Sequence, residues 1–425
     1  MKDIAEKSLF DIPGGWKTLL WILVILGIGM FIAGLMTGGE ESVVRTWQAF
    51  LINTVFWGGI AHAGVIFAVI WQITDAKWGR AFKRLAEACA GFLPISFLMF
   101  MVVFFGSHVL YEWTHTPFLH HGEAVKQGWL NLPFFISRNV FWLLLIYGIS
   151  YWFIKTSIKP DIALARRLIG SDWGGKFADW VLEDYGEHET EVIRLEKLSR
   201  KIAPVLALVY SIGGSFLAWD FVMTLDQTWF STLFGVFVMI GNMHAFLGLM
   251  LVVAVTVRQK FGIEEYISIN RLHDLAKMTF AFSLLWTYMG YSQYIVIWYA
   301  DLPEETPYLI IRSMNAPWNT LFLVIILWVF VSVFLGLLPR TLCRMPNYIR
   351  LMGIWVMLGQ LLSVYIMVVP SLQHDGHYHI FMGMHELLIT LGFVGAFFLC
   401  YLAFLGKLPI LPISDKHLCR TWHGH

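Results

Sequence analysis

Residues 47–71 read WQAFLINTVFWGGIAHAGVIFAVIW, a run without a single Asp, Glu, Lys or Arg. An α-helix rises about 1.5 Å per residue, so a run of this length can cross the roughly 30 Å hydrocarbon core of a membrane. Barrel strands are much shorter and alternate polar and apolar residues, which this run does not do. The stretch therefore predicts a transmembrane helix.

The whole chain follows the same pattern. It has 425 residues, of which 58% are hydrophobic and 14% charged, and its mean hydropathy is +0.65, whereas soluble domains carry about 25% charged residues. A net charge of +1 gives no reason to expect a nucleic-acid partner. We predict an all-α polytopic membrane protein with about ten transmembrane helices, at 18–35, 49–73, 88–110, 134–154, 202–219, 230–257, 275–299, 318–338, 349–369 and 385–405.

The distribution of basic residues predicts the orientation. If the amino terminus is cytoplasmic, all but four of the 30 Lys and Arg residues lie in or beside cytoplasmic segments. The exceptions are Arg45, Lys126, Arg138 and Arg312. With ten spans, both termini are expected on the cytoplasmic side of a multi-pass protein.

The second and sixth spans are similar to each other. Both place a His-Ala pair near the middle, in VFWGGIAHAGVIFAV and FGVFVMIGNMHAFLGLML. This weak repeat suggests a duplication, although the low identity also fits two unrelated spans.

Two histidines, His62 and His244, lie at the predicted membrane midplane. An imidazole changes charge near neutral pH, so the pair suits a proton relay. The alternative is a neutral histidine bonded to a neighbouring helix. Further relay candidates lie nearer the span ends, where charged groups are more often simply solvated; they are Glu87 and Asp274 on the cytoplasmic side and His108, Asp220 and Glu386 on the outer side.

The outer ends of the third and seventh spans are rich in aromatic and polar residues. A quinol needs an apolar slot, an aromatic wall and a hydrogen-bond acceptor. The candidate residues for such a pocket are His108, Tyr111, Tyr291, Gln293, Tyr294 and Trp298. A belt of interfacial Tyr and Trp is the alternative interpretation.

The sequence offers no strong metal or haem motif. The four cysteines show no C-x-x-C spacing, and one deep histidine in each half does not supply facing haem ligands. Two histidine groups in the outer loops lack thiolates and helical spacing, namely His115, His120 and His121, and His374, His377 and His379 with Asp375. We expect no metal, haem or iron–sulfur cluster in this chain.

One segment resembles a family signature. Residues 294–306, YIVIWYADLPEET, are similar to the IWYxxxPEET signature of the NrfD/polysulfide-reductase membrane subunits. The segment DIPGGWK at 11–17 and the run at 47–71 narrow this resemblance to the smaller NrfD-like subunit of bacterial alternative complex III. The resemblance extends over nearly the whole chain.

The resemblance implies one membrane domain, 1–425, built from two four-helix bundles. Spans 2–5 form the first, at 46–219 with a cytoplasmic loop at 156–200; spans 6–9 form the second, at 230–369; spans 1 and 10, at 16–36 and 380–406, flank them. Asp301, Glu304 and Glu305 would lie at the outer surface, where they could anchor a periplasmic subunit or release protons.

It also implies a function and partners. Such complexes sit in the bacterial cytoplasmic membrane, oxidise menaquinol, and pass electrons to a periplasmic iron–sulfur subunit and to c-type haem subunits. The larger NrfD-like subunit is the one expected to hold the quinol, so menaquinone binding in this chain stays open. Lipids and a terminal oxidase are further expected partners. A purely structural anchor and a secondary transporter are the rival functions.

The orientation can be tested with reporter fusions. A fluorescent protein fused to the carboxyl terminus should fluoresce, because that end is expected in the cytoplasm. Alkaline phosphatase inserted within residues 300–315 should be active, because that loop is expected outside. The reverse pattern would exclude the predicted orientation.

Overall fold

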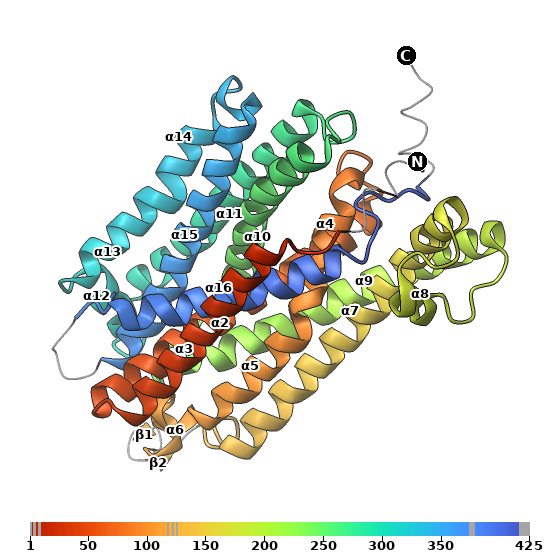
Figure 1. The fold of residues 1–425 in the computed structure, drawn as a ribbon. Coiled ribbons are helices and arrows are strands. Elements are labelled where there is room, and N and C mark those ends of the chain that lie inside the picture. The colour runs from red at the N-terminus through yellow and green to blue at the C-terminus, as the bar shows by residue number, and fades with distance from the viewer. Residues whose placement is uncertain are drawn as a thin grey trace.

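The computed structural model describes residues 2, 6, 10–116, 119–120, 123–124, 126–373 and 379–415. In these residues every regular element is a helix apart from a hairpin of two short antiparallel strands, β1 Leu119–His120 and β2 Glu123–Ala124. The predicted all-α fold of a polytopic membrane protein is confirmed. The long helices run side by side along one axis (Figure 1).

Nine helical segments in the described part of the chain are long and apolar enough to cross a membrane. A further helix, α11, has 32 residues and is more polar. The long helices are α2 Gly14–Met36, α3 Glu40–Thr74, α5 Leu93–Phe105, α7 Leu132–Ile169, α9 His188–Phe221, α10 Phe234–Phe261, α11 Ile269–Ala300, α13 Trp318–Ile325 with η5 Ile326–Ser332 and α14 Val333–Leu337, α15 Pro346–Val368 and α16 Met384–Leu405.

Shorter elements connect the long helices. They are η1 Arg80–Phe82, α4 Lys83–Glu87, η2 Ala88–Phe92, α6 Ser107–Leu110, η3 Glu112–Thr114, α8 Gly175–Leu182, η4 Met223–Leu225, α12 Thr306–Ser313, η6 Leu342–Arg344 and η7 Val369–Leu372. The segment 156–200, expected as a cytoplasmic loop with a charged helical stretch before the fifth span, is largely helical: α7 continues to Ile169, and α9 already begins at His188. Both helices extend past their apolar parts because intrahelical hydrogen bonds satisfy the backbone in water as well as in lipid.

The long helices group into two sets of four. In the first set α3, α5, α7 and α9 pack together, and in the second α10, α11, α13–α14 and α15 do so. Helix α3 also contacts α10 and α15, so it lies where the two sets meet. Every residue from Thr46 to Val69 is buried, which explains why this stretch is apolar on all sides.

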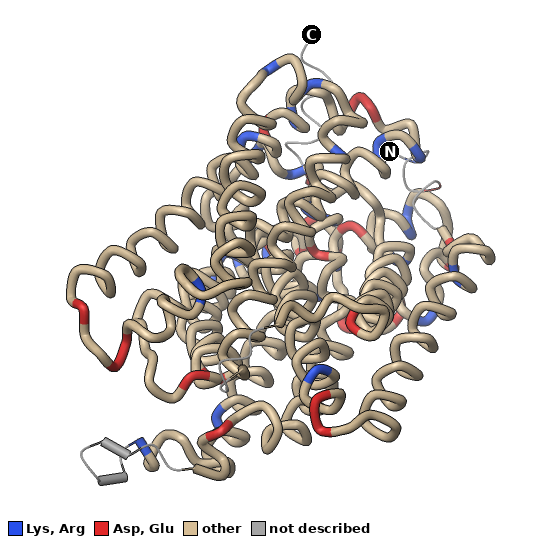
Figure 2. Tube along the Cα trace, turned by 90° about the vertical axis from the view of Figure 1, so that its left-hand side faces the viewer, with Lys and Arg blue, Asp and Glu red and all other residues tan. Residues whose placement is uncertain are grey.

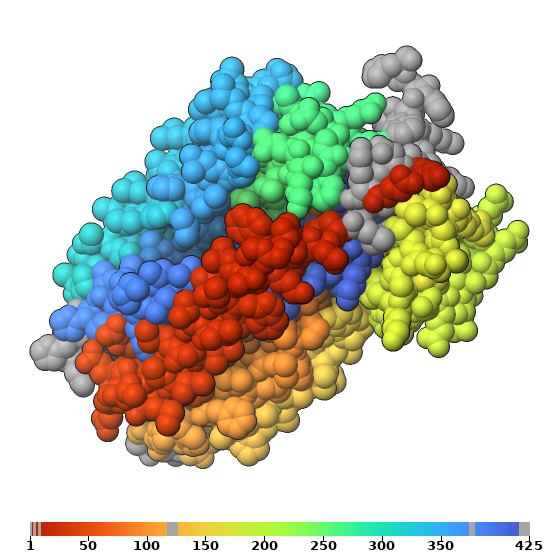
Figure 3. Space-filling view, in the orientation of Figure 1, coloured from red at the N-terminus to blue at the C-terminus, as the bar shows by residue number. Residues whose placement is uncertain are grey.

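Helices α2 and α16 lie together on the outside of the two bundles (Figure 3). The two helices are antiparallel, since Gly27 meets Gly392 at mid-length and Phe10 meets Gly406 at one end. Both described ends of the chain therefore lie at the same end of the molecule, which we call the terminal end. Lys and Arg are concentrated there (Figure 2).

Close approach of α2 and α16 depends on glycine. The buried residues of α2 are Leu20, Gly27 and Gly34, seven residues apart along one face. A Cβ atom added to Gly27 would lie 2.5 Å from the Gly392 Cα, closer than two carbons can approach.

We expect Gly27→Ala to destabilise the protein by about 1–3 kcal/mol, because the two helix backbones must separate. The control is Gly29→Ala in the same helix, where a Cβ atom would meet nothing within 4 Å and the better helix propensity of Ala should leave stability unchanged or slightly higher. Thermal unfolding of both variants in detergent measures the difference. Equal midpoints would contradict the predicted role of Gly27.

Candidate functional site

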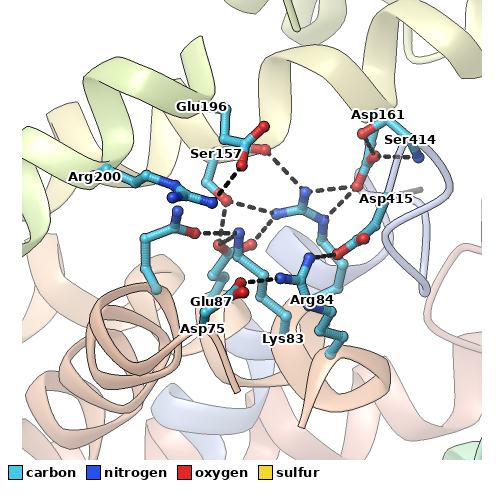
Figure 4. Close-up of polar contacts among 12 residues, drawn as sticks. Asp75, Lys83, Arg84, Glu87, Ser157, Asp161, Glu196, Arg200, Ser414 and Asp415 are labelled. Carbon is cyan, nitrogen blue, oxygen red and sulfur yellow. Dashed lines mark hydrogen bonds and ion pairs between the residues drawn. The ribbon is translucent and has the colours of Figure 1, made fainter. Parts of the chain in front are cut away.

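A buried network of charged side chains lies near the terminal end of the first bundle (Figure 4). At its centre the Arg84 guanidinium donates from Nε to Asp161 Oδ2 at 2.7 Å and from Nη1 to Glu87. Ser157 Oγ donates to Glu87 Oε1 at 2.6 Å, and its carbonyl accepts from Arg84 Nη2 at 2.9 Å. Arg84 is 2% exposed and both carboxylates are fully buried, so two acids surround one buried cation.

Three further contacts extend this network toward the surface. Lys83 Nζ lies 4.0 Å from Glu87 Oε1. Asp161 also accepts a hydrogen bond from the Ser414 backbone N–H at 2.7 Å. Arg80 forms ion pairs with Asp75 and Asp415. The network thus joins α4, α7 and the end of the described chain.

A second buried ion pair lies at the opposite end of the same bundle. Arg138 on α7 donates to both carboxylate oxygens of Asp220 on α9, at 2.6 and 2.7 Å. Asn139 Nδ2 donates to Asp220 Oδ2 at 2.8 Å, and the Arg138 guanidinium lies 4.1 Å from the Trp129 ring centroid. Such a bidentate pair offsets part of the cost of removing both charges from water.

His62 lies between these two ends in the core of the first bundle. Its ring packs edge-on against Tyr147 of α7 and Tyr210 of α9, with centroid distances of 4.9 and 5.9 Å. Its Nε2 has no hydrogen-bond partner among the described residues. A cavity of 40 Å³, also lined by Asn242, adjoins the ring and is large enough for one water molecule.

His244 has a different environment in the second bundle. It is fully buried on α10, and its Nδ1 lies 2.9 Å from Gln360 Nε2 on α15. Because Gln360 Nε2 can only donate, Nδ1 is the acceptor and the proton of a neutral ring is on Nε2. His244 therefore bonds to a neighbouring helix, as the alternative to a relay requires, while its Nε2 has no partner among the described residues.

The interior face of α7 carries polar groups along its whole length. From Asn139 onward they are spaced by 8, 3, 7 and 4 residues, which keeps them on one side of a helix, and Arg138 directly precedes Asn139. The distance from residue 138 to residue 161 is roughly 34 Å along the axis, which matches the thickness of the hydrocarbon core. We call these buried residues the α7 polar face: Arg138, Asn139, Tyr147, Ser150, Ser157 and Asp161.

Sequence reasoning missed most of this face. Residues 134–154 look like one apolar run, and Asp161 follows the run as part of a presumed loop. The available signal was the helical spacing of the polar residues within α7. Nothing in the sequence indicated that Arg84 is buried in an ion pair, because its partner Asp161 lies 77 residues away in the chain.

The other predicted relay residues, Glu386, Asp274 and His108, lie apart from the two buried sites. Glu386 pairs with Arg45, with Nη2 and Oε1 2.6 Å apart, at the end opposite the termini. Asp274 pairs with Lys277 at 2.6 Å on the surface. No Asp or Glu among the described residues of the second bundle is buried as Glu87 is. His108 is exposed, and its carbonyl contacts His115 Nε2 at 2.7 Å.

The six residues predicted to surround a quinol do not form one pocket. Tyr111 is fully buried, and its hydroxyl donates to the Phe221 carbonyl at 3.1 Å. Tyr291 and Trp298 are 59% and 61% exposed on α11, and Gln293 Oε1 accepts from Ser231 at 3.0 Å. The remaining two, His108 and Tyr294, are exposed and half-buried respectively. The exposed aromatic residues of α11 fit an interfacial belt.

The acidic end of the signature segment lies at the surface. Asp301 ends α11 in a left-handed conformation with φ of 47°, and both Asp301 and Glu304 are exposed. Glu305 is half-buried.

The structure contains no group of three or more metal-ligating side chains in the residues it describes. His121, His374, Asp375 and His377 lie outside those residues, and of His120 only the backbone is described.

Comparison with known proteins adds no assignment. No protein-family model matches the chain, and no curated protein matches it.

Removing one member of the Arg138–Asp220 pair should be costly. We expect Asp220→Asn to destabilise the protein by about 3–5 kcal/mol, because Arg138 then stays buried without its counter-charge. The matched control is Asp274→Asn, which removes a surface pair worth about 0–1 kcal/mol. Thermal unfolding compares the two variants, and equal midpoints would show that the buried pair has no special role in stability.

Proposed function

We propose that this chain is a membrane subunit of a quinol-oxidising respiratory complex in a bacterial cytoplasmic membrane, and that its first bundle conducts protons. The respiratory assignment is supported by the resemblance of residues 294–306 to the NrfD-like signature. The larger NrfD-like subunit would hold the menaquinol, since the predicted pocket residues here do not converge. Asp301 and Glu304 would face the periplasmic iron–sulfur and c-type haem subunits.

The α7 polar face is the main observation that supports proton conduction by the first bundle. A charged group inside a membrane helix costs at least about 2.5–3.5 kcal/mol, so a buried polar path needs a reason. The face connects the Glu87–Arg84–Asp161 network at one end with the Arg138–Asp220 pair at the other. In the described residues of the second bundle no Asp or Glu is buried, so we assign the path to the first bundle.

Protons would move along this face between side chains and bridging water. Tyr147 is the central member, because its hydroxyl lies 3.0 Å from Ser96 Oγ and its ring contacts His62. The step from Tyr147 to Asn139 is about 12 Å along the helix, which is too long for a direct hydrogen bond. Several water molecules would have to bridge this step, and the cavity beside His62 would hold one molecule next to the ring.

A structural anchor is the second candidate, and specific contacts favour it. Arg312 is 4% exposed and donates to the carbonyls of Ile366 and Met367 at the end of α15, and to Ser371 Oγ. This cation neutralises the negative end of a helix and so stabilises the fold. If all buried charges act in this way, no proton needs to move.

Proton translocation by the intact complex in liposomes distinguishes these two functions. The complex is driven with a short-chain quinol and an electron acceptor, and protons released per electron are measured. We expect His62→Gln, Tyr147→Phe and Ser150→Ala to lower this ratio, because each removes a group that can pass a proton. Electron transfer with an uncoupler present should persist.

The matched control for Ser150→Ala is Ser137→Ala, which makes the same change on the exposed side of α7. An unchanged proton-to-electron ratio in all three variants would leave only the structural role. Co-purification of the chain with iron and c-type haem tests the respiratory assignment separately.

A further inference from the structure

The last described residues of the chain cover the terminal end of the first bundle. After α16 ends, Leu408, Ile410, Leu411 and Ile413 are all buried, each 2% exposed or less. Pro409 and Pro412 lie between them and restrict the backbone. Residues 408–415 are therefore held in place by apolar contacts, and we call them the strap.

The strap ends in two polar contacts with the buried network. Ser414 donates to Asp161 Oδ1 from its backbone N–H at 2.7 Å and also from its hydroxyl. Asp415 pairs with Arg80. Figure 4 shows both residues approaching the network from the side opposite Glu196 and Arg200. We call these two contacts the latch.

A polar cavity of 150 Å³ lies beneath the strap. Arg84 and Ser157 line it from the network, Ser414 and Asp415 from the strap, and Ser199 from α9. This volume is large enough for several water molecules.

The cavity contains polar atoms that need a partner. Ser199 is 4% exposed, and its hydroxyl has no hydrogen-bond partner among the described residues. Arg80 Nε, which also belongs to a residue lining the cavity, is buried without one. A buried polar atom left without a hydrogen bond is costly, and water supplies both donors and acceptors. The lining of the cavity is rich in charged and hydroxyl side chains, so water is the ligand that it fits.

We propose that the cavity is a water-filled chamber between bulk solution and Glu87, and that the strap closes it. Glu87 accepts from Ser157, and Ser157 lines the chamber, so water there is one side chain away from the buried acid. Release of the latch lets the end of the strap lift and opens the chamber to solution. Its role in supplying protons rests on the proposed function, whereas its closure by the strap does not.

Cysteine labelling in the full-length chain tests the closure. Ser199→Cys is treated with a small charged methanethiosulfonate, and the wild-type signal from native cysteines is subtracted. We expect slow labelling with the strap in place. Adding Ser414→Ala and Asp415→Asn weakens the latch, because it removes the Ser414 hydroxyl bond to Asp161 and the charge that pairs with Arg80. The Ser414 backbone bond to Asp161 and the apolar contacts that hold the strap in the fold remain. Labelling should then become about tenfold faster, because a lost hydrogen bond to a charged group shifts the opening equilibrium by that order.

The control is Ala203→Cys, one turn further along α9, which is fully buried and does not line the cavity. It should stay unlabelled in both backgrounds. Fast labelling of Ser199→Cys with the latch intact, or no change when the latch is weakened by the two substitutions, would overturn the closure. An equal increase in the labelling rate of Ala203→Cys would mean that the whole bundle has become looser, and it would also overturn the closure.

Proton translocation by the latch variant in the reconstituted complex separates this inference from the proposed function. Faster labelling together with altered proton uptake supports both. Faster labelling with an unchanged proton-to-electron ratio would keep the closure and exclude a supply of protons from the chamber.

Discussion

The arrangement of this protein depends on the cost of placing charge away from water. Three of the buried arginines are satisfied by particular acceptors: Arg84 by Glu87 and Asp161, Arg138 by Asp220, and Arg312 by carbonyls at the end of α15. Because an unpaired charge is expensive in such surroundings, these contacts fix which helices lie together and in which register. They hold α4 against α7, α7 against α9, and α12 against α15.

The two halves of the chain share the arrangement of their helices but differ in the polar groups that they bury. In both, a central helix with a deep histidine lies within a set of four, and α3 and α10 contact each other between the sets. The first half has buried carboxylates at both ends and a polar path between them. In the described part of the second half, the deep histidine is bonded to Gln360 and the acidic residues are near the surface. A duplication followed by divergence of the interior would produce this contrast, with buried carboxylates kept in the first bundle alone among the described residues.

The strap connects the terminal end of the molecule to its interior. Helix ends in a membrane protein usually face water. If the terminal end of this bundle were uncovered, the acids near it would exchange protons freely with solution. Here apolar residues of the strap cover the Glu87–Asp161 network, while a few polar contacts hold its end. Apolar contacts are not directional, and the polar contacts are specific, so the segment can stay attached while its end moves.

The sequence by itself determined the class of fold and the approximate positions of the long helices, because lipid imposes long apolar runs that are visible in one dimension. It also indicated that His62 and His244 lie near the middle of predicted membrane spans and Asp220 near the end of one. Only the tertiary structure decided that Arg84 meets Asp161, that Arg138 meets Asp220, and that Tyr111 and Tyr291 do not share a pocket. Charged pairs form between residues far apart in the chain, and their burial depends on helix rotation and packing, which hydropathy does not encode.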